Sequence, residues 1–103
     1  MLRNDAQGEA SAAFYDKRRQ WIDLVCEDHR VGHATFRIGH WLAKKMNGKD
    51  QCCWYSVAVI AKLLGVSTKT VTEATTELET LGLMIVVRKK GRGNTYHIRL
   101  PFV

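Results

Sequence analysis

Residues 57–76, VAVIAKLLGVSTKTVTEATT, decide the fold of this chain. Apolar residues recur at helical spacing through the first half of this stretch, and Ser56 just before it has a side-chain oxygen that can cap a helix N-terminus. Gly65 follows, and glycine readily takes the positive φ with which many helices end. Ser67 is suited to cap the next helix. The stretch therefore predicts two short helices joined by a tight turn.

The second helix has an apolar stripe at steps of three and four, made by Val71, Ala74, Leu78 and Leu81. Gly82 ends it. Ala61 is small where the two helices would cross, and the turn glycine and the β-branched Val71 follow it at fixed distances. This spacing resembles the helix-turn-helix motif.

The resemblance implies that the second helix is a recognition helix whose N-terminal end enters the DNA major groove. Hydroxyls and lysine bond phosphates or base edges, and a threonine methyl contacts the thymine methyl. The alternative is an ordinary solvated helix face. The residues predicted to contact DNA from this helix are Ser67, Thr68, Lys69, Thr70, Thr72, Glu73 and Thr76.

Beyond Gly82 the pattern changes from helix to strand. The apolar run at 83–87 and the alternation at 95–100 predict a β-hairpin spanning 83–100. Its tip is basic and contains two glycines, as in the wing of a winged helix, and it would lie on the DNA backbone or insert an arginine into the minor groove. A solubilising loop that protects a sheet edge is the alternative. The residues predicted to contact DNA from the wing are Arg88, Lys89, Lys90, Arg92 and Asn94.

The N-terminal half is expected to supply two more helices. Residues 1–10 lack apolar periodicity and are expected to be a flexible leader. Helices are expected at 11–27, with the basic cluster Lys17, Arg18 and Arg19 on its polar side, and at 33–46. The buried stripe of the second is predicted to be Ala34, Ile38, Trp41 and Leu42. Residues 52–55 are β-prone and would pair with the hairpin.

Composition limits the class of protein. The chain has 103 residues, a net charge of +6 and a pI near 9.5. That length suits one modest core, so we expect a single domain at 11–103. The basic charge favours a polyanionic partner such as nucleic acid. The sequence shows neither a run of about 20 apolar residues nor a signal-peptide core, so we expect a cytoplasmic, nucleoid-associated protein that does not enter a membrane.

The cysteines and histidines leave one alternative open. Three cysteines do not make a disulfide framework, and reduced thiols are the simpler interpretation. Cys26, His29 and His33, with Cys52 or Cys53, have a spacing seen in zinc sites. We favour no metal and no cofactor, because a helix-turn-helix core needs neither.

From about Trp21 to Leu100 the chain resembles the winged helix-turn-helix domains of plasmid and phage replication initiators and related bacterial transcription regulators. The residues that carry the resemblance are Trp21 and Asp23, Tyr55-Ser56, Ile60-Ala61, Leu64 to Ser67, Thr70-Val71, Leu78, Leu81 to Leu83, and Gly93-Asn94 with Tyr96. It implies a mostly helical α+β fold with an additional N-terminal helix and a small antiparallel wing, and it implies binding to double-stranded DNA.

We therefore expect a sequence-specific DNA-binding protein that is not an enzyme. The fold serves regulators of transcription and of replication alike, and both roles stay open, as does a place within a longer protein. A palindromic site would require a homodimer, for which we nominate the helix at 11–27. The alternative from another class is a winged helix that docks other proteins and does not read DNA.

Overall fold

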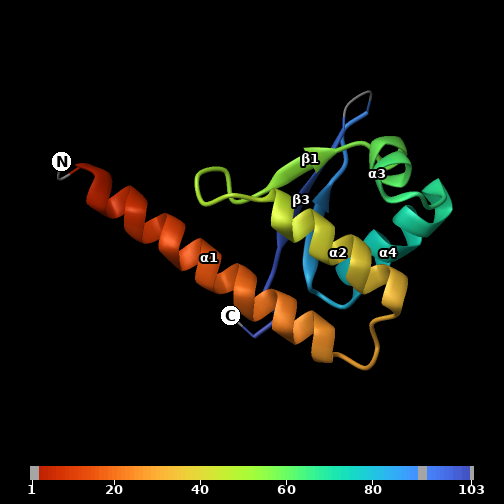
Figure 1. Cartoon of the computed structure of the whole chain (residues 1–103), viewed down its shortest axis with the longest axis horizontal. Coiled ribbons are helices and arrows are strands. Elements are labelled where there is room, and N and C mark those ends of the chain that lie inside the picture. The colour runs from red at the N-terminus through yellow and green to blue at the C-terminus, as the bar shows by residue number, and fades with distance from the viewer. Residues whose placement is uncertain (1–2, 91–92, 103) are drawn as a thin grey trace.

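A computed structural model describes residues 3–90 and 93–102 of the chain (Figure 1). The side chains of residues 3–7 are not described. The elements in chain order are α1 (Arg3–Glu27), α2 (His33–Lys45), β1 (Cys53–Tyr55), α3 (Val57–Leu64), α4 (Thr68–Thr80), β2 (Met84–Val87) and β3 (Asn94–Ile98). This arrangement confirms the expected α+β winged helix, mostly helical, with an additional N-terminal helix.

The turn between α3 and α4 has the predicted capping. Ser56 Oγ accepts a hydrogen bond from the Val59 amide at 3.1 Å, and Ser67 Oγ accepts one from the Thr70 amide at 3.0 Å. Gly65 ends α3 in the left-handed region, with φ of 69°. Local side-chain chemistry thus specifies where both helices begin and where the first one ends.

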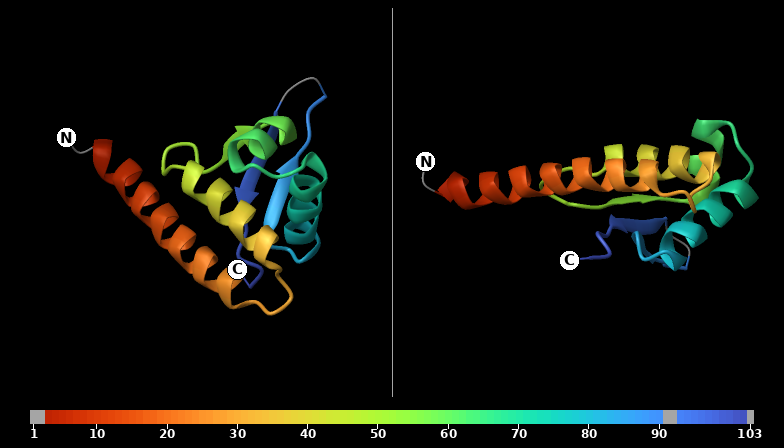
Figure 2. Two further views of the ribbon diagram at one scale, coloured as in Figure 1. Left: turned by 45° about the vertical axis from the view of Figure 1, so that its right-hand side comes forward. Right: turned by 90° about the horizontal axis from the view of Figure 1, so that it is seen from below.

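The three strands form one antiparallel sheet in the order β1-β3-β2. Val86 pairs with Tyr96 and Cys53 pairs with the same tyrosine from the other side, so the hairpin expected at 83–100 takes β1 as its third strand. Tyr96, Ile98 and the following Leu100 are buried, as the alternation predicted. α1 and α2 lie on one side of the strands (Figure 2).

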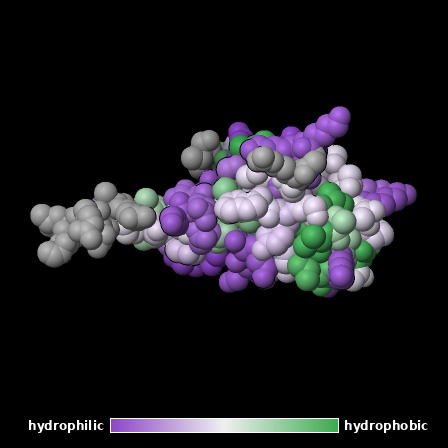
Figure 3. Space-filling view, turned by 90° about the horizontal axis from the view of Figure 1, so that it is seen from above, coloured by the Kyte–Doolittle hydropathy of each residue, from purple (hydrophilic) through white to green (hydrophobic). Residues whose placement is uncertain are grey.

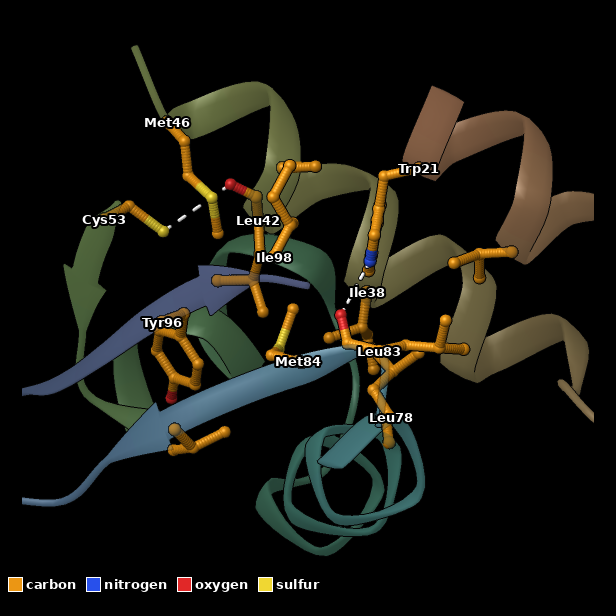
Figure 4. Packing of buried hydrophobic residues seen from close by; sticks show 14 of the residues in the cluster. Trp21, Ile38, Leu42, Met46, Cys53, Leu78, Leu83, Met84, Tyr96 and Ile98 are labelled. Atoms are coloured by element: carbon orange, nitrogen blue, oxygen red, sulfur yellow. Dashed lines mark hydrogen bonds between the residues drawn. The ribbon is translucent and has the colours of Figure 1, made fainter. Parts of the chain in front are cut away.

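Helices and sheet meet around Trp21, which is fully buried. Its indole Nε1 donates a hydrogen bond to the Leu83 carbonyl at 2.6 Å, at the entry to β2 (Figure 4). Gly39 on α2 makes room for this contact: a Cβ there would lie 2.9 Å from Leu78 Cδ1 and 3.2 Å from Trp21 Cη2. α1, α2 and α4 therefore approach closely at one glycine.

The first helix is longer than expected. The predicted start at Ser11 was wrong, because α1 begins at Arg3 and runs through most of the stretch expected to be a leader; residues 1 and 2 lie outside the described residues. This stretch contains no proline, and a helix that is already formed extends easily through alanine, glutamine and glutamate without a buried face. At 1.5 Å per residue, α1 is about 38 Å long.

The buried stripe of α2 was only partly predicted. Ile38 and Leu42 are buried and Trp41 is half-buried, but Ala34 is exposed. Thr35 and Gly39 are buried instead, and neither counts as apolar when a sequence is scanned for periodicity. The helix therefore lies turned slightly from the expected orientation.

The loop after α2 attaches the middle of α1 to the rest of the molecule. Tyr15 Oη accepts a hydrogen bond from the Gly48 amide at 3.1 Å, and Arg18 Nη1 donates one to the Met46 carbonyl at 3.0 Å. Arg19 pairs with Asp16 on the same helix. The basic cluster of α1 is thus largely occupied by contacts within the chain.

Replacing Trp21 by phenylalanine should lower the free energy of unfolding by about 2–3 kcal/mol, because it removes the indole hydrogen bond to the Leu83 carbonyl, which keeps its bond from the Arg99 amide, and leaves a void in the core. Urea denaturation measures the loss. Trp54→Phe is the matched control, because Trp54 is 57% exposed and its replacement should change stability by less than about 0.5 kcal/mol. Equal effects of the two substitutions would contradict the assigned core.

Candidate nucleic-acid interface

The N-terminal half of α4 presents most of the predicted contact residues to solvent. Val71, Ala74, Thr75 and Leu78 are buried and orient the helix. The side chains that this orientation leaves exposed are those of Thr68, Lys69, Thr72, Glu73 and Thr76. They lie on successive turns of one helix, an arrangement that suits insertion into a groove.

Two of the predicted contact residues, Ser67 and Thr70, are hydrogen-bonded to each other at the start of α4. Ser67 Oγ accepts from the Thr70 amide and also lies 2.9 Å from Thr70 Oγ1. Ser67 is exposed and Thr70 is half-buried. Both hydroxyls therefore take part in the N-terminal cap of α4.

The wing extends from the β2–β3 hairpin, and β2 packs against α4. β2 ends at Val87, and the exposed Lys89 and Lys90 follow before the strand returns at Asn94. The predicted contact residue Arg92 lies outside the described residues. Figure 3 shows hydrophilic residues next to the wing tip and a separate hydrophobic patch over α3.

Arg88 is bound to α4. Its Nη2 and Nη1 donate to the two carboxylate oxygens of Glu79 at 2.9 and 3.1 Å. The hydrogen bonds from Arg88 lower the pKa of Glu79, and the same pairing raises the pKa of Arg88. The lowered pKa of Glu79 means that the stabilisation from the pair is present at neutral pH and is lost as the pH falls through that pKa.

Asn94 has a structural partner as well. It begins β3 opposite Tyr55, and its Nδ2 donates to the Tyr96 hydroxyl at 3.3 Å. Burial raises the pKa of Tyr96, and the hydrogen bond from Asn94 opposes that shift. Asn94 thus helps to close the base of the wing.

Sequence reasoning missed two cations next to the helix-turn-helix. Arg37 on α2 donates from Nη2 to the Leu64 carbonyl at 2.9 Å, at the C-terminal end of α3 where a cation is favourable. Lys62 is exposed on α3 between Val59 and Leu63. A cation in the last turn of a helix was a signal for Lys62, whereas nothing in the sequence links Arg37 to Leu64.

The cysteines and histidines considered as a metal site are not grouped. Cys53 is buried and its thiol donates to the Leu42 carbonyl at 3.5 Å, whereas Cys26 is exposed on α1. Burial raises the pKa of Cys53 to about 12. Within 3–90 and 93–102, no three His, Cys, Asp or Glu side chains lie together as metal ligands would.

The fold and this surface define a winged helix-turn-helix. The family model described as a helix-turn-helix domain matches residues 30–84, just over half of the chain, and the chain belongs to that family. The family is a DNA-binding, non-enzymatic kind, so membership points to DNA as the partner. No curated protein matches the chain significantly. Of the helices in the described ranges, none is both long and apolar enough to span a membrane.

Ser67→Ala should destabilise the fold by about 1 kcal/mol, because it removes the acceptor for the Thr70 amide. Thermal or urea unfolding measures the change. Thr72→Ala is the control on the same helix: its side chain is exposed, and alanine favours helix, so stability should stay the same or rise slightly. A Ser67→Ala variant as stable as the control would show that the cap contributes nothing.

Proposed function

We propose that the chain is a sequence-specific reader of double-stranded DNA, with the N-terminal half of α4 in the major groove and the wing on the backbone or in the minor groove. The observation that carries the proposal is the exposed face of α4 beside the cationic wing, in a chain of the helix-turn-helix family. Its role would be that of a small bacterial, plasmid or phage regulator of transcription or replication, acting in the cytoplasm at the nucleoid.

The proposed roles differ between residues. Lys69 would contact a phosphate or a guanine edge, and Thr68, Thr72 and Thr76 would contact base edges or thymine methyls. Glu73 is exposed and would accept from a cytosine amino group. Lys89, Lys90 and Arg92 would supply backbone contacts that hold register without reading sequence.

Lys69→Ala and the double variant Lys89→Ala/Lys90→Ala should both weaken binding to a preferred duplex, measured by fluorescence anisotropy at several salt concentrations. The slope of log K against log salt should fall by about 0.9 for each phosphate contact that is lost. The double variant should lower the affinity for all duplexes about equally. Loss of a base contact at Lys69 should also reduce the preference for one sequence over another.

Lys44→Ala is the matched control, because it removes a lysine that is also exposed from the C-terminal end of α2. It should leave affinity and salt slope near those of the unmodified protein. A protein that binds no duplex at low salt, or whose affinity is reduced no more by the α4 and wing substitutions than by this control, would refute the proposed function.

A second prediction concerns the pair between Glu79 and Arg88, which would hold the wing at a fixed angle to α4. Removing an acidic charge near DNA should strengthen binding by Coulomb's law alone. We expect Glu79→Gln to weaken it instead, by about two- to fivefold, because the wing loses its attachment. Fluorescence anisotropy with the same duplex shows whether the substitution weakens or strengthens binding.

Glu77→Gln is the control for charge. It makes the same change on the same helix, and Glu77 accepts only a long bond, at 3.4 Å, from the Gly32 amide. Its affinity should equal or exceed that of the unmodified protein. Tighter binding by Glu79→Gln would show instead that Arg88 is released to contact DNA.

We also propose that a homodimer forms through α1. The first turns of α1 project beyond the rest of the molecule (Figure 1), and Gly8, Glu9 and Ala10 are exposed there. Two such helices would pair about a two-fold axis and match a palindromic site. Analytical ultracentrifugation of the chain with and without residues 1–10 compares the two association states.

Protein docking is the second candidate function. Val59 and Leu63 on α3 are 44% and 60% exposed, one turn apart, and they give the helix an apolar outer face. If docking were the main function, substitutions in the wing would leave partner binding intact, and duplex binding would be absent.

A further inference from the structure

The sheet face that points away from the core carries large apolar side chains. The strand register places Trp54, Thr95 and Val87 side by side on this outer face. Ile85 lies two residues before Val87 in β2 and therefore shares the face. The exposed fractions are 57% for Trp54, 48% for Ile85 and 41% for Val87. α1 and α2 lie on the opposite side of the strands (Figure 2).

Trp54 lines two shallow hollows, and each of them contains a lysine. The first has a volume of about 350 Å³ and is lined by Lys45 together with Asn47, Asp50 and residues 52–55, which include strand β1. The second has about 300 Å³ and is lined by Lys89, Gly93 and Thr95. Each hollow beside the exposed indole therefore contains a lysine. In the first hollow, the Lys45 ammonium lies over the Trp41 ring at 5.0 Å from its centroid, within reach of a phosphate only if it turns away from that ring, and Asp50 is the acidic residue.

The proposed duplex contacts share Lys89 with this arrangement but do not account for Trp54. They use the N-terminal half of α4 and the tip of the wing, whereas Trp54 lies on β1 at the outer face of the sheet. Base pairs inside a duplex are already stacked on one another and have no free face to offer an indole. An unpaired base has two.

We propose that this outer face binds single-stranded DNA. Trp54 is the stacking platform for one base, and Lys45 and Lys89 contact the phosphates on its two sides. Val87 and Ile85 continue the apolar surface for a neighbouring base. Binding is tolerant of sequence, since every base has a π-face, and it does not depend on α4 reading a duplex.

The charges favour a nucleic acid over a protein partner. Lysine is depleted in protein–protein interfaces, and both hollows beside the indole contain one. A second copy of this chain would bring the same cations against themselves across a two-fold axis. A single strand instead neutralises them through its phosphates.

The test is binding of a fluorescein-labelled oligothymidine of about ten nucleotides, measured by anisotropy at two salt concentrations. We expect the unmodified protein to bind and Trp54→Ala to lose about tenfold in affinity, as the loss of one base–aromatic stack predicts. Trp54→Phe should retain most of the affinity. Lys45→Ala and Lys89→Ala should each reduce the salt slope by about 0.7.

Leu63→Ala is the matched control, because it removes a side chain that is 60% exposed from α3, away from the sheet. It should bind the oligonucleotide as the unmodified protein does. Absence of oligothymidine binding, or equal binding by Trp54→Ala, would overturn the proposal. Self-association that Trp54→Ala abolishes, seen by analytical ultracentrifugation, would overturn it in favour of a protein interface.

Trp54→Ala and Lys69→Ala, each measured on both ligands, separate this proposal from the proposed function, whereas Lys89 belongs to both surfaces. Trp54→Ala should bind duplex normally, and Lys69→Ala should bind oligothymidine normally. If the protein bound oligothymidine but no duplex, the proposed contacts of α4 with duplex DNA would be refuted and the single-strand site would be retained. An equal loss on both ligands with Trp54→Ala would place the indole within the duplex interface and overturn a separate site.

Discussion

The hydrogen bond from the Trp21 indole to the Leu83 carbonyl is the contact on which the rest of the structure depends. Leu83 lies between the end of α4 and the start of β2, so this bond relates the first helix to the point where the wing begins. It is possible because Gly39 has no side chain and lets Trp21 and Leu78 meet across α2. A buried, paired carbonyl and a close glycine contact together leave little freedom for these elements to shift.

The packing that fixes the C-terminal end of α4 also sets which side of its N-terminal half faces solvent. Val71, Thr75 and Leu78 face the core, so the polar side of the helix turns outward at its N-terminal half. The ion pair between Glu79 and Arg88 then joins the helix to the strand that enters the wing. An exposed pair of this kind contributes little to overall stability, but a bidentate pair defines an angle. The pair between Glu79 and Arg88 therefore orients the wing strand relative to α4 and adds little to the free energy of unfolding.

The sequence predicted the features that local chemistry decides. The caps at Ser56 and Ser67 and the turn at Gly65 are short-range, and each was found where the residue type implied it. The extension of α1 to Arg3 was missed, because an exposed helix needs no apolar period. The pairing of Arg88 with Glu79, the place of Trp21 and the exposure of Trp54 depend on how distant segments pack, which periodicity does not encode. The sequence assigned Arg88 to DNA, and the structure adds a partner within the chain, Glu79, that no local pattern indicated.

We propose that α4 and the wing form one surface for duplex DNA. The most direct test is an NMR titration of the labelled protein with a duplex selected from a random pool by its affinity for this chain. The amides of Thr68 to Thr76 and of Lys89 and Lys90 should shift, while those of α1 around Trp21 should stay in place. Shifts confined to α1 or to the α3 residues Val59 and Leu63, with α4 unchanged, would contradict the account.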